Sequence, residues 1–584
     1  MHIRYGVILL GAACSLLLSI ACRADREGSR AAASGTRDSV EWFTERAQEA
    51  GLIFVHFNGM SGKFLYPELM PPGVALFDYD NDGDLDVFIV QGRMLGTTPL
   101  DDARPKPSGP PPVKGRLFRN DLQIRADGSR TLHFTDVTEA SGINAQGYGM
   151  GAATGDYNND GCIDLYVTNL GRNQLYRNNC DGTFTDVSRK SGTDDEGWSV
   201  SAAFFDFDRD GWPDLFVGHY LQYSVDANRH CFAVSGSADY CPPHLYRPQP
   251  SRLFHNNRDG TFTDVTVAAG MAREYGPTLG VSTADFDGDG WVDLFVANDS
   301  EPNQLWINQR NGTFKNTALL SGVALSPEGG VKANMGVDAG DFDNDGDDDL
   351  FIGELASQGS DLYVNNGAGV FEERSASAGI RIASLPYTGF GAAWLDFDND
   401  GWLDLLTVNG AVTQNLEALA RNEPFPLKQR KLLFRNRGDG RFEDVSSLAG
   451  AFFALPEVSR GAAFGDIDND GDTDVIIGTD SGPVRLLLNN LGSRTHWVGL
   501  KLASGTPRHD VAGARVALTR GDGLTIWRRA RADGSYASAN DPRVLIGLGD
   551  SATPPRVRVI WPDGRSDEYS AAVDRYTTLT ERGP

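Results

Sequence analysis

The chain has 584 residues, of which 40% are apolar and 68 are glycine, and its net charge is -26 at pH 7. This length suits one large repeat architecture with a small additional domain. So acidic a chain is a poor partner for nucleic acid or an anionic membrane, because phosphate groups repel it, whereas cations are natural partners.

The first 22 residues have the features of an export signal. Arg4 precedes an apolar run over residues 7–20, which is short for a membrane span. The ending Ser19-Ile20-Ala21-Cys22 resembles the lipobox of bacterial lipoproteins, but Ser19 stands where leucine is usual. Ser19 and Ala21 also suit ordinary signal-peptidase cleavage. We expect an extracytoplasmic protein, either secreted or lipidated at Cys22 and anchored at the cell surface or in the periplasm.

The polar, small residues 23–45 predict a flexible tether. The proline-rich residues 104–115 are interpreted as a loop insertion, with a polyproline docking segment as the alternative.

An aspartate-rich loop occurs seven times in the body of the chain. Loops 1 to 7 (residues 78–86, 156–164, 206–214, 285–293, 341–349, 396–404 and 466–474) all fit D-x-[DN]-x-D-G-x-x-D. Oxygen ligands at positions 1, 3 and 5 converge when the chain curls around an ion, and glycine at position 6 permits the turn. Position 7 can offer its carbonyl, and the aspartate at position 9 closes the shell. Hard oxygen ligands in a flexible loop indicate Ca²⁺, up to seven ions per chain.

The predicted metal ligands follow from these positions. They are Asp78, Asp80, Asp82, Asp84 and Asp86; Asp156, Asn158, Asp160, Cys162 and Asp164; Asp206, Asp208, Asp210, Trp212 and Asp214; Asp285, Asp287, Asp289, Trp291 and Asp293; Asp341, Asp343, Asp345, Asp347 and Asp349; Asp396, Asp398, Asp400, Trp402 and Asp404; and Asp466, Asp468, Asp470, Asp472 and Asp474. Loop 2 has Asn158 in place of an aspartate and is expected to bind calcium most weakly. The three tryptophans could also form a sugar-binding platform, or else cover neighbouring repeats.

The flanks of the loops predict strands. An EF-hand needs glutamate at position 12 and flanking helices, but position 12 is never acidic here. Segments such as "GVALF" before and "LDVFIV" after the loops are rich in β-branched and aromatic residues. Each loop is therefore predicted to connect two strands of a calcium-binding β-hairpin.

A second hairpin lies between successive loops. It begins "LFRN", "LYRNN", "LFHNN", "LWINQ", "LYVNN" and "LFRNR", and each copy has an Asn/Asp/Gly turn before a second strand. Two hairpins per repeat give four strands, and seven repeats predict an all-β, seven-bladed β-propeller over residues 46–492. The last copy, "RLLLNN", lacks its second strand, and residues 52–58 are predicted to supply it and close the ring.

Four cysteines remain in the body of an exported chain, which indicates two disulfides. Close spacing favours Cys162–Cys180 and Cys231–Cys241 among the three pairings. Cys231 and Cys241 also lie near His219, His230, His244 and His255, so a zinc or copper site is the alternative to a disulfide with surface histidines.

The repeats resemble the FG-GAP/VCBS repeats of the integrin alpha-chain propeller over roughly residues 70–490. Residues 493–584 resemble the ASPIC/UnbV domain through Gly513–Val516, Gly534-Ser535-Tyr536, Gly547-Leu548-Gly549 and Trp561-Pro562-Asp563-Gly564. Together they resemble the cartilage acidic protein family. The resemblance implies calcium on one propeller face and an extracytoplasmic interaction role, and it brings no reaction.

Two hypotheses about the function remain open. The first is a binding or scaffold protein at the cell surface that contacts a protein or glycan. The second is an enzyme or accessory subunit that uses a pocket in a propeller face or the His/Cys insertion. The sequence has no serine nucleophile elbow, phosphate-binding glycine loop or HExxH motif, so we expect no catalytic residues. A pocket with converging titratable groups, away from the loops, would favour the enzyme.

Overall fold

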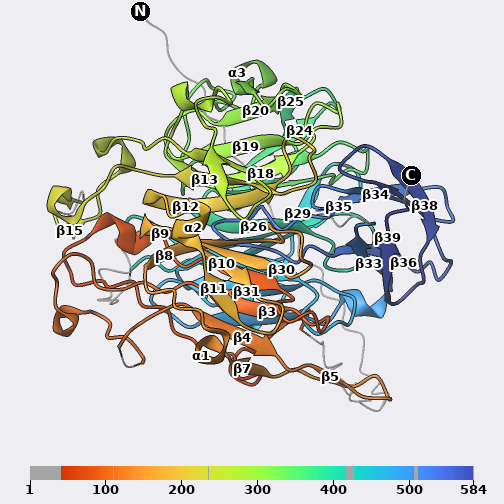
Figure 1. Ribbon diagram of the computed structural model, residues 1–584, viewed down its shortest axis with the longest axis horizontal. Helices are drawn as coiled ribbons and strands as arrows, with labels where there is room; N and C mark the ends of the chain where they lie inside the picture. Colours follow the sequence, from red (N-terminus) through yellow and green to blue (C-terminus); the bar gives the residue numbers. More distant parts are fainter. Residues whose placement is uncertain are drawn as a thin grey trace, which may run out of the picture. The chain divides into compact units, whose positions relative to one another are not determined.

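The computed structural model describes residues 41–582 except 110, 234–235, 415–425, 506–508 and 510. The predicted export signal with Cys22, and most of the predicted tether, lie outside the described residues. Among the described residues, no helix has the length and apolar character needed to cross a membrane. The fold consists mainly of strands, and its helices are short turns in the connections between them (Figure 1).

Seven groups of four antiparallel strands, units 1 to 7, follow one another along the described chain, and units 2 and 3 are joined into one eight-stranded sheet by pairing of their strands β9 and β12. The strands of units 1 to 4 are β2 (Val74–Phe77), β3 (Asp86–Ile89), β4 (Arg116–Asn120) and β7 (Phe134–Asp136); β8 (Tyr148–Gly155), β9 (Asp164–Arg172), β10 (Gln174–Asn178) and β11 (Phe184–Asp186); β12 (Glu196–Phe205), β13 (Asp214–His219), β16 (Arg252–Asn256) and β17 (Phe262–Asp264); and β18 (Thr278–Ala284), β19 (Asp293–Asn298), β20 (Gln304–Asn308) and β21 (Phe314–Asn316).

The strands of units 5 to 7 are β22 (Asn334–Gly340), β23 (Asp349–Glu354), β24 (Asp361–Asn365) and β25 (Phe371–Glu373); β26 (Gly389–Leu395), β27 (Asp404–Asn409), β28 (Leu432–Asn436) and β29 (Phe442–Asp444); and β30 (Ser459–Gly465), β31 (Asp474–Thr479), β32 (Arg485–Asn489) and β1 (Phe43–Glu45). Small hairpins pair β5 (Gln123–Ile124) with β6 (Arg130–Thr131) and β14 (Cys231–Phe232) with β15 (Ala238–Asp239). The α-helical turns are α1 (Thr138–Ser141), α2 (Ser188–Ser191), α3 (Ala318–Ser321) and α4 (Ile380–Ser384).

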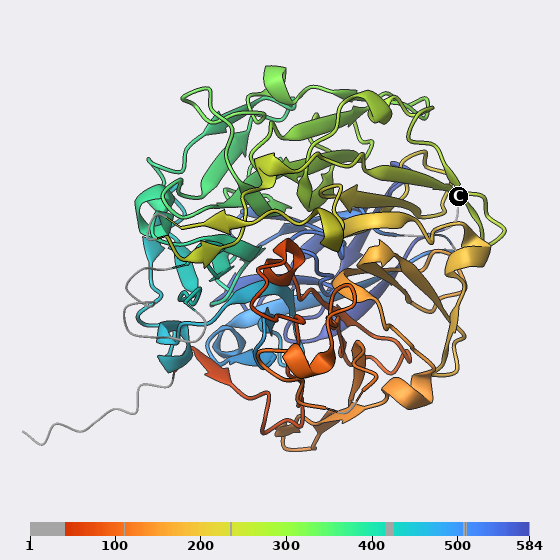
Figure 2. The same ribbon diagram turned by 90° about the vertical axis from the view of Figure 1, so that its left-hand side faces the viewer.

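The first strand of each unit is its innermost strand, and these strands contact one another in chain order. β2 contacts β8, the series continues through β12, β18, β22 and β26 to β30, and β30 contacts β2 again. In Figure 2 the sheets follow one another around the view in sequence colours from orange to light blue. Apolar side chains such as Phe77 and Phe88 of unit 1 pack against Leu165 and Tyr176 of unit 2. Burial on both faces explains why the second strands read as continuous apolar runs.

The prediction that residues 52–58 supply the closing strand of the last sheet is wrong. β1 pairs with β32, with Phe43 opposite Asn489, whereas Val55 makes only an isolated bridge to Pro483. Phe43 is fully buried beside Phe397, Phe453 and Leu487, which fixes β1 at this edge. The last sheet is thus completed from the N-terminal side, but by residues 43–45, which the sequence analysis had placed in the tether.

The C-terminal residues form two further sheets. One has the order β36-β33-β39, from β36 (Val544–Gly549), β33 (His496–Ala503) and β39 (Tyr576–Thr580). The other has the order β35-β34-β37-β38, from β35 (Thr525–Arg529), β34 (Arg515–Thr519), β37 (Arg556–Ile560) and β38 (Ser566–Ser570). Their apolar faces share one core that includes Val516, Ile546 and Trp561.

A segment between β35 and β36, residues 533–541, lies among the innermost strands of all seven units. We call it the central segment. Ala539 exchanges backbone hydrogen bonds with β2, and the carbonyls of Ala537 and Ser535 accept from β8 and β22. Side-chain or backbone hydrogen bonds join it also to β12, β18 and β30, and the ring of Tyr536 meets Phe390 of β26 at 4.9 Å. The C-terminal residues therefore belong to the same compact unit as the repeats.

Candidate functional site

Each of loops 1 to 7 joins the innermost strand of its unit to the second strand, so all seven lie at the same end of the innermost strands. Within every loop the carboxylate at position 1 accepts the backbone N–H of the position 6 glycine at 2.7–3.1 Å. These glycines have φ between 83° and 102°, a region that favours glycine. The carboxylate at position 5 accepts the N–H of position 7 at 2.8–3.2 Å. Both contacts curl the loop inward.

The curled loops bring their carboxylates together as the sequence predicts. Carboxylate oxygens of Asp78, Asp80 and Asp86 lie within 4.8 Å of one another. The same holds for position 1, 3 and 5 aspartates of loop 3 (Asp206, Asp208, Asp210) and of loop 4 (Asp285, Asp287, Asp289). Three to four oxygen ligands at this separation match the donor set of a Ca²⁺ loop.

Several of these oxygens are buried and accept no hydrogen bond. They are Oδ1 of Asp78, Asp80, Asp285, Asp343, Asp398, Asp468 and Asp472. A buried carboxylate oxygen without a donor is costly unless a cation or water serves it. Four of the seven belong to position 3, the position that makes the fewest hydrogen bonds within the loop. The residues present therefore fit a hard cation.

The electrostatics of the loops agree with this fit. Burial raises the pKa of Asp396 and Asp468 to about 8, and repulsion from Asp400 and Asp470 adds to the shifts. Burial likewise raises the pKa of Asp341 to about 7. Negative charge in these loops is thus disfavoured by the protein alone, and a cation among the carboxylates would reverse this.

The position 9 aspartate has a role that the sequence analysis missed. In every loop one of its oxygens accepts the N–H of position 2 at 2.9–3.4 Å. The other accepts, at 2.7–2.8 Å, the N–H of the asparagine that ends the third strand of the unit. These two bonds leave each oxygen a lone pair for a metal, except at Asp214, whose Oδ1 is also bonded to His255. This carboxylate thus ties the loop to its own sheet.

The same asparagine links each unit to the preceding one, and we call this set the linking asparagines. Their side-chain amides donate to the carbonyl at position 2 of the preceding loop at 2.7–2.9 Å; they are Asn120, Asn178, Asn256, Asn308, Asn365, Asn436 and Asn489. Asn120 reaches Ile467 of loop 7 and so closes the series. The signal was present as the N of each "LxxN" repeat, which the sequence analysis interpreted only as a hairpin.

Replacement of a linking asparagine should destabilise the protein. Asn178→Ala removes the donor to the buried carbonyls of Tyr79 and Ile163. Leaving such groups unpaired costs about 1–3 kcal/mol in the free energy of unfolding. Chemical denaturation should detect this loss. The neighbour Asn179, whose side chain bonds locally to Thr183, Arg177 and Thr185, serves as the matched control Asn179→Ala. Equal stability of the two variants would contradict the linking role.

Side chains at loop position 4 join neighbouring loops directly. Five asparagines donate to the position 6 carbonyl of the next loop at 2.8–3.4 Å, namely Asn81, Asn159, Asn344, Asn399 and Asn469. Arg209 makes the equivalent bond to Gly290. Loop 4 has Gly288 here and cannot make the link, and Arg515 of β34 donates to Gly346 in its place.

The C-terminal residues contact the loops at several points. Lys501 Nζ lies 3.5 Å from Asp78, Arg515 lies 3.5 Å from Asp285, and the Tyr576 hydroxyl donates to Asp466 at 3.0 Å. All three aspartates are position 1 residues. Arg529 also pairs with Asp348 of loop 5 at 3.2 Å. Residues from the C-terminal sheets thus cover carboxylates of the loops.

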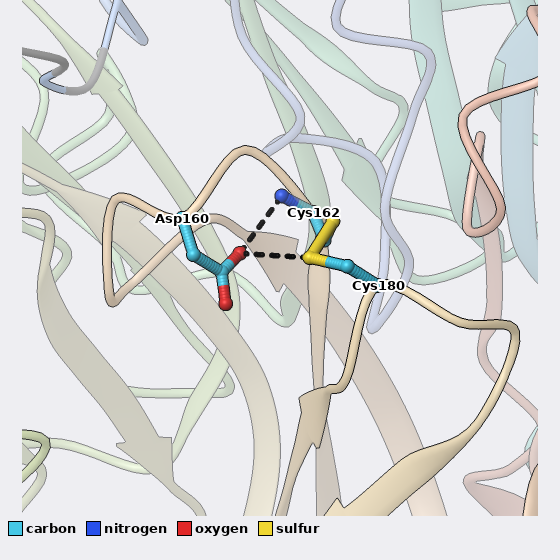
Figure 3. A group of neighbouring side chains, drawn as sticks. All are labelled: Asp160, Cys162 and Cys180. Carbon is cyan, nitrogen blue, oxygen red and sulfur yellow. Dashed lines mark hydrogen bonds between the residues drawn. A yellow bond between two sulfur atoms is a disulfide. The ribbon is translucent and has the colours of Figure 1, made fainter.

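The predicted disulfide pairing is confirmed, with Cys162 bonded to Cys180 and Cys231 bonded to Cys241. In Figure 3, Asp160 accepts the backbone N–H of Cys162 at 3.0 Å beside the first disulfide. Because both sulfurs are bonded, this group offers no thiolate. Only the Asp160 carboxylate and the Cys162 carbonyl remain as candidate ligands in this part of loop 2.

The alternative zinc or copper site is not assembled. Cys231 and Cys241 are bonded to each other, so they supply no thiolate. His219 is buried, with Nε2 2.7 Å from Asp195 and Nδ1 2.7 Å from the Pro250 carbonyl. His255 lies instead at loop 3, where its hydrogen bond to Asp214 raises the pKa of the imidazole. The two histidines therefore have separate structural partners.

The position 7 tryptophans do not form one open platform. Arg209 of loop 3 stacks over the Trp291 ring at 4.5 Å, and the Trp402 ring lies against Gly438 of the neighbouring hairpin. Both contacts fit the alternative in which these rings cover neighbouring repeats.

Comparison with known families places the repeats and the C-terminal residues. Residues 156–217, 244–296, 285–352, 341–407 and 428–477 match the family described as FG-GAP-like repeat. Residues 505–583 match the family described as ASPIC and UnbV. The repeat matches include loops 2 to 7, and loop 1 lies outside them.

Among curated proteins, cartilage acidic protein 1 of Homo sapiens is 28% identical over 196 residues, 32% of this chain and 29% of that protein. The Xenopus tropicalis protein is 34% identical over 178 residues, 28% of this chain and 25% of that protein. The match thus spans less than a third of these relatives. A solved structure of an Agrocybe aegerita lectin, described as recognising non-reducing terminal N-acetylglucosamine, covers 71% of this chain and 87% of its own at 14% identity and a TM-score of 0.38. That score supports no argument about this chain.

Proposed function

We propose that this chain is an exported calcium-binding β-propeller of the cartilage acidic protein family, acting as a binding or scaffold protein. Its matches to FG-GAP-like repeats, to ASPIC and UnbV, and to cartilage acidic protein 1 support this. The seven units are the blades of this propeller. Loops 1 to 7 each hold one Ca²⁺ through positions 1, 3, 5 and 9 and the carbonyl of position 7. Extracytoplasmic location agrees with the two disulfides.

The main support for calcium binding is one observation on the loops. Seven loops repeat the same hydrogen-bonded curl, and buried carboxylate oxygens in five of them accept no hydrogen bond. An acidic surface without a metal would expose such oxygens to water. Calcium would supply the missing positive charge in each loop, and the linking asparagines would pass its ordering effect to the next unit.

The scaffold role has to use surfaces other than the position 1 carboxylates that the chain itself covers. Lys501, Arg515 and Tyr576 contact three of these groups. A protein or glycan partner that coordinated calcium at loops 1, 4 or 7 would compete with those contacts. We therefore assign the calcium a structural role and the partner contacts to other faces.

Substitution of one loop ligand should remove one calcium ion. Asp343 stands at position 3 of loop 5, and its Oδ1 is buried without a hydrogen bond. Asp343→Ala leaves no oxygen at that position, so we expect the calcium content of desalted protein, measured by atomic emission, to fall by about one equivalent. Asp127→Ala, which changes an exposed aspartate that belongs to none of the loops, is the control. An unchanged calcium content in Asp343→Ala would contradict the site at loop 5.

A further inference from the structure

A cavity of about 530 Å³ opens at the end of the innermost strands opposite to loops 1 to 7. Leu279, Met335 and Phe390, which lie at the beginnings of β18, β22 and β26, contribute to its wall. The loops begin where these strands end. The hairpin β14–β15, with its Cys231–Cys241 disulfide, forms part of the rim. This volume is typical of sites for small organic ligands.

Aromatic rings line much of this cavity. Tyr66 and Tyr220 lie with ring centroids 6.0 Å apart, and their hydroxyls share a 2.7 Å hydrogen bond. Tyr240 is buried in the wall, and Phe232 lies on the rim with 70% of its surface exposed. So large an exposed phenylalanine beside buried tyrosines indicates a surface that a ligand can cover.

The fixed charges of the described cavity lining are carboxylates. They belong to Asp299 and Asp239; the described lining also includes His244 and has no lysine or arginine. Asp299 is 8% exposed and accepts hydrogen bonds from the hydroxyls of Tyr220 and Ser300, at 2.5 and 3.0 Å. Among the described residues, no lysine, arginine or histidine pairs with either carboxylate. Burial raises the pKa of Asp299, as expected for a carboxylate with no cation beside it.

Two cationic side chains close to lining residues are bound to other groups. Arg460 stacks over Phe390 at 4.1 Å, and its guanidinium donates to the carbonyls of Leu69, Gly410 and Ala411. Lys332 precedes the lining residue Ala333, but its Nζ is bound to Asp361 at 2.5 Å and to the Gly359 carbonyl. Neither residue lines the cavity, so among the described residues Asp299 has no lysine or arginine partner.

We propose that this cavity binds a small organic ligand carrying an ammonium group, with the ammonium beside Asp299 and against the rings of Tyr66 and Tyr220. A cation over aromatic faces is stabilised by the ring quadrupoles, more so when water is excluded. A buried carboxylate that lacks a charged partner adds direct attraction. Neutral ligands gain neither contribution, and anions are repelled. The site is independent of calcium because it lies at the far end of the strands from the loops.

Calorimetric titration of the full mature chain in saturating calcium tests this proposal. Choline is the cationic probe, and its uncharged carbon isostere dimethylbutanol has the same shape without the charge. N-acetyl-lysine methylamide distinguishes a free small molecule from a lysine side chain of a protein. We expect choline or the lysine probe to bind at least about tenfold more tightly than dimethylbutanol.

Two substitutions test the contributions of the carboxylate and of the rim to binding. Asp299→Asn preserves the shape and the hydrogen bond from Tyr220 but removes the charge, and should weaken binding of the cationic probe about tenfold or more. Phe232→Ala changes an exposed rim residue and should weaken binding severalfold without affecting the melting temperature. Leu320→Ala, at an equally exposed site on the helical turn α3, is the control and should bind like the original chain.

Each outcome either supports or overturns the proposed site. Charge-selective binding that Asp299→Asn weakens supports the site. Absence of saturable binding by either cationic probe, or equal affinity for dimethylbutanol, would each overturn it. None of these results depends on whether loops 1 to 7 hold calcium.

Discussion

Removal of calcium is expected to lower the melting temperature of the mature protein by about 10 °C or more, because under our proposal each loop gains stability from a bound ion. A loop that binds calcium at a hundredfold excess over its Kd gains about 2.7 kcal/mol. Seven such loops would together contribute on the order of 15–20 kcal/mol. Without the ion, each loop keeps three or more carboxylates within a few ångströms of one another.

The structure indicates that the loss would spread beyond the loops. The position 9 aspartate holds both its loop and the linking asparagine of its unit, and that asparagine holds the preceding unit. Loosening of one loop therefore weakens two sheets. We expect a single cooperative transition that shifts as a whole, and not the early melting of a separate part.

Differential scanning calorimetry in calcium and in EGTA measures this effect. EGTA that has been saturated with calcium beforehand is the control, because it contains the chelator but removes no ion. An unchanged melting temperature after chelation, with no calcium found in the protein, would mean that the loops are acidic turns. Water would then have to donate hydrogen bonds to the buried oxygens of Asp80 and Asp468, which accept none from the protein.

Tyr536→Ala is expected to destabilise the whole protein by about 3–5 kcal/mol, the usual cost of truncating a large buried aromatic side chain. Tyr536 is fully buried, its hydroxyl donates to the Met70 carbonyl at 3.2 Å, and its ring meets Phe390 edge to face. The central segment around it bonds to the innermost strands. A C-terminal domain that was merely tethered would leave the repeats unaffected.

Denaturation followed by tryptophan fluorescence and by circular dichroism distinguishes these cases. Tyr275→Ala removes a tyrosine that is 47% exposed and serves as the control. If Tyr536→Ala unfolds in two separate transitions, with the repeats at their original stability, the central segment does not couple the C-terminal sheets to the rest. A common shift of both probes would show that the repeats depend on it.

The extent of sequence-based prediction differs between the loops and their connections. The loop positions were predictable because a metal ligand set imposes fixed spacing along the chain, and the hydrogen bonds at positions 1, 5 and 6 are local. The linking asparagines carry an equally regular signal. Their role was missed because the bond partner of Asn120, at Ile467, is 347 residues away. Periodicity shows that a residue is repeated and does not show what it touches.

By itself the sequence determined the all-β repeats, the seven aspartate loops, the family resemblance and the disulfide pairing, since all of these rest on local pattern or short separation. Only the tertiary structure decided which residues complete the last sheet, where the central segment inserts, and that Arg515 takes the place of the side chain that Gly288 lacks. The cavity with Asp299 likewise forms from residues of separate units. These features depend on contacts between distant segments, and packing of whole sheets selects among partners that a local pattern leaves equivalent.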